Sequence, residues 1–180
     1  MSNKTDEIDA MFQYDKGKAV KLIGTQRLKA YKVAYNHLTN MQEQGKLAVS
    51  DNYLGDNELA KNIYEKKYYL KNLKNELIED SPEDVFKRLA SFLSTVEGGK
   101  TNQKDWAEKF YNELYEGRFV SGGRVLAGAG DIYRIKTLAN CFVSKIKHDD
   151  IDSIYEAAFE CARTYSYGGG IGVDISALRP

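Results

Sequence analysis

The order of short apolar runs, helical patterns and glycines in the last third of the chain most constrains its fold. The apolar run Asn140-Cys141-Phe142-Val143 is followed by a polar turn and by helical periodicity from about Ile151 to Tyr167. A glycine-rich stretch from Gly168 to Gly172 comes next. Short apolar runs are typical of buried strands, and glycines after a helical pattern indicate a tight turn into the next element. The sequence therefore predicts an α/β arrangement from about Phe119 onward.

Residues before Phe119 show helical patterns. The clearest helix begins after Ser81, a suitable N-cap, with Pro82 at its first position and Gly98-Gly99 after its end. Another pattern runs from Gln103 or Lys104 to about Glu116, with Trp106, Phe110 and Leu114 on one face. We therefore expect helices throughout this region.

Three regions follow from these patterns. Residues 1–50 are polar and weakly periodic, with Lys29 to Met41 as the best helical segment, and form an N-terminal extension whose order the sequence does not define. Residues 51–118 form a helical domain. Residues 119–180 begin an α/β domain. The predicted fold class is α/β, with a mainly helical N-terminal region followed by a strand and a helix.

Charge and composition exclude several kinds of partner. Lys and Arg number 26, as do Asp and Glu, so no net field attracts nucleic acid or an anionic membrane. The chain start has no apolar signal region, and no run of 18 apolar residues occurs. We expect a cytoplasmic protein. Its two cysteines, Cys141 and Cys161, are then expected to be reduced thiols.

Two glycine motifs resemble nucleotide-binding signatures and fail in detail. A phosphate loop ending in Gly99-Lys100-Thr101 needs a glycine where Ser94 stands. A dinucleotide fingerprint starting at Gly170 needs its third glycine where Ile175 stands. Two readings of Gly168 to Gly172 stay open. The glycines either make a tight turn or let the main chain approach a ligand.

The cysteines and histidines give no metal site. No Cys-x-x-Cys, histidine cluster or ordered carboxylate pair occurs, and His37 and His148 lie in polar segments where we expect them to be solvated. Cys161 lies on the apolar stripe of its helix and is expected in the core. Cys141 begins a strand, where its thiol is either a core group or presented to a cleft.

The helix from Ile151 has two notable features. Asp149, Asp150 and Asp152 crowd its N-terminus, where negative charge is favourable. They cap the helix, or Asp149 accepts hydrogen bonds from ribose hydroxyls. A broad apolar stripe predicts that one face is buried against a sheet or a partner. It comprises Ile151, Ile154, Tyr155, Ala158, Phe159, Ala162 and Tyr165.

Taken together, these motifs resemble the large catalytic subunit of ribonucleotide reductase. The resemblance rests on Gly122 to Leu126, Asn140 to Val143, Asp152 to Ile154 and Gly168 to Pro180, in the family's order. Weaker similarity, including Ser81 to Arg88, reaches back to about Asn52. The resemblance implies a helical domain followed by the first strand and helix of a ten-stranded α/β barrel, which is incomplete in this chain.

That family reduces the 2′ carbon of ribonucleotides with a thiyl radical and a redox-active cysteine pair. By resemblance, Cys141 is the first member of the pair. Asn140, Gly169, Gly170 and the turn at Gly123 and Arg124 fall where the substrate is held. Many relatives have Ser or Thr at the position of Gly123 and Ser at that of Asn140. Main-chain N–H groups are therefore expected to bind phosphate at Gly123.

The resemblance also implies regulation and a cofactor. Asp149, Asp150, Ile151 and Arg179 match the site for an allosteric nucleotide effector, a dNTP or ATP, and place the helix from Ile151 at a dimer interface. The stretches Thr137 to Val143 and Arg163 to Gly170 look most like the class that uses adenosylcobalamin. That cofactor is expected in the assembled enzyme, with no residue of this chain assigned to it.

The family's radical-forming cysteine, catalytic glutamate and second cysteine of the pair fall beyond Pro180. We therefore expect the N-terminal part of a split reductase, inactive alone. The expected partners are a second chain carrying the remaining barrel, a further copy in a dimer, a ribonucleotide substrate and an external dithiol reductant. Two alternatives are a non-catalytic nucleotide-binding or regulatory module and an inactive fragment of an interrupted gene.

Overall fold

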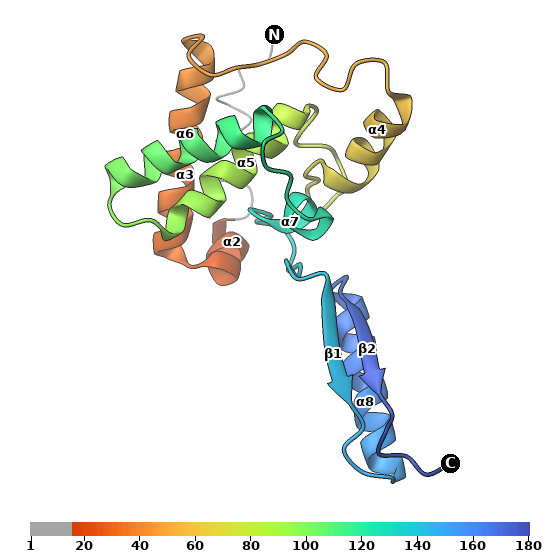
Figure 1. The fold of residues 1–180 in the computed structure, drawn as a ribbon. Helices are drawn as coiled ribbons and strands as arrows, with labels where there is room; N and C mark the ends of the chain where they lie inside the picture. Colours follow the sequence, from red (N-terminus) through yellow and green to blue (C-terminus); the bar gives the residue numbers. More distant parts are fainter. Residues whose placement is uncertain (1–15) are drawn as a thin grey trace. The chain divides into compact units, whose positions relative to one another are not determined.

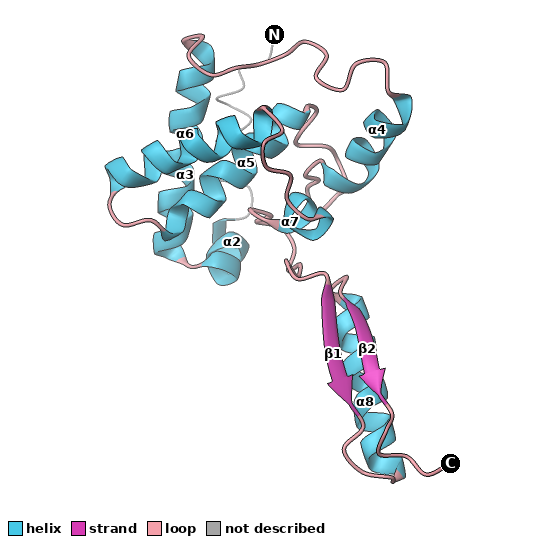
Figure 2. Ribbon diagram, in the orientation of Figure 1, coloured by secondary structure: helices cyan, strands magenta, loops and turns pink. Residues whose placement is uncertain are grey.

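A computed structural model describes residues 16–180 and divides the chain into two compact units, Met1–Arg134 and Ile135–Pro180 (Figure 1). The described part of the first unit is helical, and the second unit combines two strands with a helix (Figure 2). The predicted order, helices first and α/β structure afterwards, is confirmed.

The helical unit is built from elements between residues 16 and 128. They are α2 (Lys16–Ile23), α3 (Thr25–Glu43), α4 (Glu58–Ile63), the π-helical turn η1 (Tyr64–Tyr68), α5 (Pro82–Leu93), the 3-10 turn η2 (Ser94–Val96), α6 (Lys100–Tyr115) and α7 (Gly123–Gly128). The predicted start of α5 is confirmed, because the Ser81 side chain accepts a hydrogen bond from the Asp84 N–H and Pro82 is the first helical residue.

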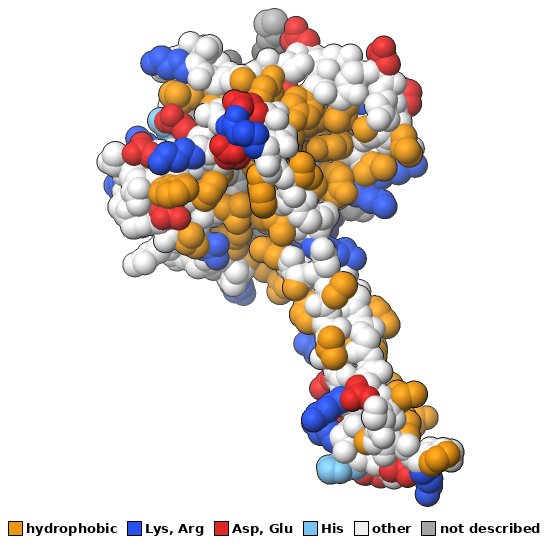
Figure 3. Space-filling view, viewed as in Figure 1, with side chains coloured by type: hydrophobic (Ala, Val, Ile, Leu, Met, Phe, Trp, Pro, Cys, Tyr) orange, Lys and Arg blue, Asp and Glu red, His pale blue; other side chains and the backbone are white. Residues whose placement is uncertain are grey.

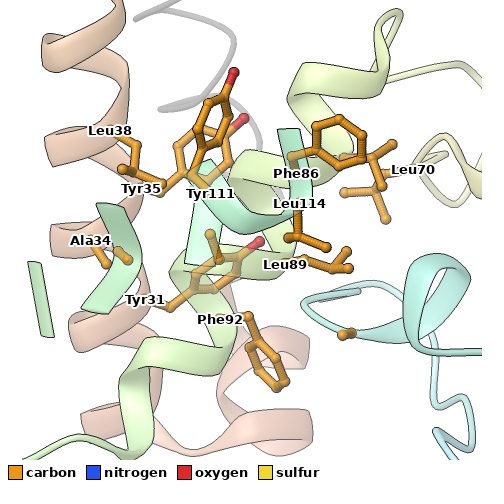
Figure 4. Close-up of a cluster of buried hydrophobic side chains, with 14 of the residues drawn as sticks. Tyr31, Ala34, Tyr35, Leu38, Leu70, Phe86, Leu89, Phe92, Tyr111 and Leu114 are labelled. Carbon is orange, nitrogen blue, oxygen red and sulfur yellow. The ribbon is translucent and has the colours of Figure 1, made fainter. Parts of the chain in front are cut away.

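Helices α3, α5 and α6 pack against one another around the core of this unit (Figure 4). The α3 side chains Tyr31, Ala34 and Leu38 are fully buried in it. The order of residues 1–50 was not predicted, because this segment is polar and weakly periodic, and its residues 1–15 lie outside the described part of the chain. Tyrosines and alanines supply much of the apolar stripe of α3. Their spacing of three and four residues nevertheless gives one continuous buried face.

Helix α6 differs from its prediction in two respects. It begins at Lys100, and its buried residues are Ala107, Tyr111 and Leu114, while Trp106 and Phe110 stay partly exposed. The buried face is therefore rotated from the predicted one. Tyr111 fixes this rotation, because its hydroxyl donates a 2.7 Å hydrogen bond to the Ala48 carbonyl.

The prediction that His37 is solvated is wrong. Its Nε2 lies 2.5 Å from Glu108 Oε1, and its side chain is mostly buried. The pair joins α3 to α6. A polar sequence neighbourhood concealed this contact, because the partner is distant in the chain.

The helical unit extends beyond the boundary expected at residues 118 and 119. Ala129, Ile132 and Tyr133 are buried in the same core as α3 and α5. Arg134 then donates hydrogen bonds to the carbonyls of Lys71 and Asn72. The structure therefore divides the chain after Arg134.

The second unit is a strand–helix–strand unit. Strand β1 (Cys141–Lys145) pairs in parallel with β2 (Gly170–Asp174), with Cys141 opposite Gly170, and α8 (Ile151–Ser166) connects them. A parallel pair needs such a crossover, which the helix supplies. Helix α8 packs on both strands.

The apolar stripe of α8 does not pack on the strands. Ser153 and Ala157 are buried, and Cys161 is half-buried, whereas Ile151, Tyr155, Phe159 and Tyr165 are 59–70% exposed. Small side chains let the helix approach the strands closely, and the large apolar ones point outward. Within residues 16–180, no helix is long and apolar enough to cross a membrane.

Candidate active site

Cys141 lies on the face of the strands that α8 does not cover. The Ser144 hydroxyl, three residues along β1, hydrogen-bonds the Glu160 carboxylate of α8. Successive strand side chains point to opposite faces, so Cys141 and Val143 point away from α8. This is the side of β1 and β2 turned toward the viewer in Figure 1, and hydrophobic side chains appear along it in Figure 3.

The register places two glycines beside these side chains. Gly170 pairs with Cys141, and Gly172 pairs with Val143. A Cβ at Gly172 would have no atom within 4 Å, and one at Gly170 would have only the Asn140 carbonyl oxygen, at 3.5 Å. Gly170 therefore leaves open space next to Cys141, and Gly172 leaves open space next to Val143 on the same face. Gly172 was not among the predicted site residues, although its spacing of two from Gly170 places both on one strand face.

Gly168 and Gly169 have a different role. Gly168 has a φ of +86°, which favours glycine. A Cβ at Gly169 would lie 2.7 Å from the Phe142 ring and 2.9 Å from the Thr164 methyl. Of the two readings left open by the sequence, the tight turn describes Gly168 and Gly169, and the open space at Gly170 and Gly172 leaves room for the main chain to approach a ligand.

Asn140 connects β1 to this turn through its main chain. Its carbonyl accepts a 2.9 Å hydrogen bond from the Gly170 N–H, and its side chain is exposed. The structure thus brings Asn140, Cys141, Gly169 and Gly170 together. Cys141 itself is an exposed, free thiol.

The predicted effector residues gather at the start of α8. The Arg179 guanidinium lies 3.3 Å from the Asp149 carboxylate, and Ile151 is exposed. Asp150 is the N-cap of α8 and accepts a 2.7 Å hydrogen bond from the Ser153 N–H. That hydrogen bond holds the pKa of Asp150 below its ordinary value.

Gly123 and Arg124 belong to the helical unit, where they begin α7. Arg124 is exposed. A Cβ at Gly123 would lie 3.5 Å from the Tyr68 hydroxyl oxygen, so this tyrosine borders the turn.

No group of three or more His, Cys, Asp or Glu side chains that could hold a metal ion occurs between residues 16 and 180. A cavity of about 350 Å³ lies on the α8 side of β1 and is lined mainly by Phe142, Arg163, Thr164 and Tyr167, with residues 135–137. Cys141 does not line it.

Comparison with known proteins gives the family. The sequence model of the ribonucleotide reductase all-alpha domain matches residues 54–133, and that of the ribonucleotide reductase barrel domain matches residues 139–180. Together the two matches cover more than half of the chain. The chain belongs to the ribonucleotide reductase large-subunit family. Its two compact units correspond to these two domains, because the first match ends next to Arg134 and the second begins just before β1.

Individual ribonucleotide reductases show the same similarity. The chain is 30% identical to the ribonucleoside-diphosphate reductase subunit alpha of Helicobacter pylori over 153 residues, 84% of this chain and 18% of that protein. It is 31% identical to the large subunit of Variola virus over 130 residues, 72% of this chain and 15% of that protein. The chain thus spans less than a fifth of these relatives, and corresponds to the N-terminal region of the large subunit.

Proposed function

We propose that this chain supplies the N-terminal part of a ribonucleotide reductase catalytic subunit and that Cys141 is one of its two electron-donating thiols. One observation carries the proposal. The free thiol of Cys141 begins the first strand of the barrel-domain segment, on the uncovered face, opposite the open position at Gly170. A substrate on that face can reach the thiol.

In the proposed reaction, a pair of thiols supplies the two electrons and two protons that the reduction consumes. A thiyl radical removes the 3′ hydrogen of the ribose and later returns it. The 2′ hydroxyl leaves as water, while Cys141 and a second cysteine give up two electrons and two protons and form a disulfide. An external dithiol then reduces the disulfide by thiol–disulfide exchange. The second cysteine and the radical-forming cysteine are assigned to the remainder of the barrel.

The substrate contacts are proposed for each unit separately. Gly170 and Gly172 have no Cβ, so the ribose can approach the main chain beside Cys141, and the exposed Asn140 side chain can bind its hydroxyls. Gly169 acts indirectly, by allowing the turn. Gly123 and Arg124 are proposed to bind the substrate phosphates through main-chain N–H groups and the exposed guanidinium.

The start of α8 is proposed as the effector site. Asp149, held beside Arg179, accepts hydrogen bonds from the ribose of a dNTP or ATP, and Arg179 offers charge to its phosphates. Asp150 positions this site as the helix cap, and the exposed Ile151 side chain contacts the base. The outward apolar stripe of α8 is proposed to form the dimer interface.

The strand unit requires further protein around it. Val143 is 89% exposed, and the described sheet has two strands, which cannot close a barrel. We propose that the rest of the barrel comes from a second polypeptide of a split reductase working in the cytoplasm. Adenosylcobalamin is the proposed radical source of the assembly. The described residues present no metal-ligand cluster for its cobalt, so we assign none of them to it.

Replacing Cys141 by Ser tests the proposal in the complex reconstituted with the remaining barrel. We expect multiple turnovers with an external dithiol to fall by more than about a hundredfold, because serine cannot form the disulfide. Cys161→Ser is the matched control and should retain turnover, since Cys161 lies on α8 away from the open face. An unchanged rate with altered effector response would indicate the regulatory module instead. Reduction by the second polypeptide alone would also contradict the proposal.

A further inference from the structure

The largest fully buried side chain of the helical unit is an arginine. Arg88, on α5, is 0% exposed. Its guanidinium donates to both carboxylate oxygens of Glu79, at 2.6 and 3.2 Å, and to the carbonyl oxygens of Ala129 at 2.6 Å, Leu126 at 2.9 Å and Tyr68 at 3.0 Å. A buried charge of this kind is tolerated only when it is paired and its hydrogen bonds are made.

Glu79 provides the pairing. Its carboxylate also accepts a 2.8 Å hydrogen bond from the Leu70 N–H, which leaves both of its oxygens occupied. The ion pair therefore joins α5 to the chain segment just before it. This accounts for the burial of both charges, but not for the three carbonyls on the guanidinium.

Two of these carbonyls belong to the end of α7 and the residue after it. The last carbonyls of a helix have no partner within the helix and carry partial negative charge. Arg88 reaches Leu126 and Ala129 from α5 and so caps α7 with a buried positive charge. Tyr68, whose carbonyl is the third acceptor, ends η1 and places its hydroxyl 3.5 Å from the position of a Cβ at Gly123.

Apolar packing alone does not determine where α7 lies. The helix has six residues, too few to be stable in isolation, and Leu126 is its one buried side chain. The partly buried Val125 also packs on the core, but two adjacent apolar side chains on so short a helix restrain its rotation only weakly. Directional hydrogen bonds from a rigid guanidinium to the Leu126 carbonyl of α7 and to the Ala129 carbonyl just after it restrict that rotation further.

We infer that the buried Arg88–Glu79 pair is a positioning element for α7 and for the turn at Gly123 and Arg124 that begins it. One guanidinium holds the end of α7 and also Tyr68, the residue that borders Gly123. The consequence for substrate binding rests on the proposed function, in which this turn contacts the substrate phosphates. The positioning itself does not depend on that function.

The variant Arg88→Lys tests the positioning in the full chain. Lysine keeps a positive charge near Glu79, but its compact ammonium cannot reproduce the fork that spans Glu79 and the carbonyls. We expect hydrogen exchange at the Leu126 and Ala129 amides to accelerate about tenfold or more relative to the amides of α3 and α6. Leu38→Ala, a fully buried change on α3, is the control for general loss of stability.

Equal acceleration in α7, α3 and α6 would overturn the inference, because Arg88 would then be an ordinary core residue. If Arg88→Lys does not fold, Glu79→Gln serves as the second variant. It keeps the side-chain shape and removes the charge, and should loosen α7 in the same selective way. A Glu79→Gln chain with unchanged α7 exchange would also overturn the inference.

Steady-state kinetics of the reconstituted complex test the link to substrate. Arg88→Lys should raise the KM for ribonucleotide about tenfold with kcat changed less than about threefold, whereas Leu38→Ala should leave KM unchanged. A loosened α7 with an unchanged KM would overturn the substrate part. A wild-type complex that reduces no ribonucleotide would contradict the proposed function, and the exchange experiment would still decide the positioning.

Discussion

Side chains from two helices close around Gly130, which follows α7 in the chain. Its φ is +77°, and a Cβ there would lie 2.8 Å from Arg88 Cγ, 2.9 Å from the Tyr31 hydroxyl oxygen and 3.2 Å from Phe92 Cβ. The Tyr31 hydroxyl also donates to the Gly130 carbonyl at 3.3 Å. Neither α3 nor α5 can move away from this position without disturbing the core.

Replacing Gly130 by Ala should lower the free energy of unfolding of the helical unit by about 3 kcal/mol, because left-handed backbone strain adds to overpacking. Gly117→Ala is the matched control. Its φ is +67° and a Cβ would meet no atom within 4 Å, so only the backbone strain of about 1 kcal/mol remains. Urea unfolding of the full chain measures both. Equal losses in the two variants would refute the steric argument.

The sequence indicates single residues well only where their partners are local. Ser81 could be assigned as a helix cap because its hydroxyl accepts a hydrogen bond from the N–H of Asp84, only three residues away. The contacts of Gly130 and His37 come from distant helices, so no local pattern indicates them. For Cys141, the strand pattern predicted its position at the start of β1, but its exposure on the uncovered face needed the register with β2.

Helix α8 illustrates the same limit for a whole element. The helical periodicity of its apolar residues was predicted correctly, so the sequence shows which residues share a face of the helix. The period does not say which face packs on the strands. Ser153 and Ala157 face them, and the large apolar stripe faces outward. Close packing of a helix on two short strands favours small side chains, a steric preference that hydrophobicity alone does not indicate.

The N-terminus of α8 should give a defined acid response. The hydrogen bond from the Ser153 N–H lowers the pKa of Asp150 below its ordinary 3.8. Because the pKa is lower in the folded chain, ionised Asp150 stabilises α8 fully when the pH is above the ordinary pKa of the unfolded chain. This contribution is lost as the pH falls through the folded-state pKa. We expect the Ser153 amide to lose protection from hydrogen exchange between about pH 5 and pH 2.

Asp150→Asn keeps an oxygen that can cap the helix and removes the charge, so its Ser153 amide should show no such transition. Asp150→Ala should lack the protection at every pH. A transition of the same size in Asp150→Asn would mean that another group causes the acid response.

At the scale of the whole molecule, the two units differ in how much apolar surface they bury. The helical unit has a continuous core drawn from α3, α5, α6 and the segment after α7. In the strand unit the buried apolar side chains are Ile146 and Ala157, while Val143 and Phe159 are largely exposed. A unit with so small a core gains little stability from its own packing.

The sequence of the strand unit was enough to identify its family, but it did not indicate what stabilises the unit. The motifs from Asn140 to Pro180 are local and ordered, so they showed the resemblance to the family, and that resemblance implied a barrel segment. What covers the exposed face of β1 and β2 depends on residues outside this unit, which its local motifs do not describe. The C-terminal boundary of the helical unit could not be predicted from local sequence either, because its last buried residues, Ile132 and Tyr133, pack on helices much earlier in the chain.

We therefore expect the strand unit to be stabilised by the remaining barrel. In the chain alone, the main-chain amides of β1 and β2 should exchange quickly, because their opening exposes little apolar surface. Adding the second polypeptide proposed to carry the remaining barrel should slow them by about a hundredfold or more, as open edges and the Val143 face become covered. The α3 and α5 amides are the internal control and should keep their rates. Strand amides that are equally protected before and after mixing would contradict this coupling, since the strand unit would then be stable by itself.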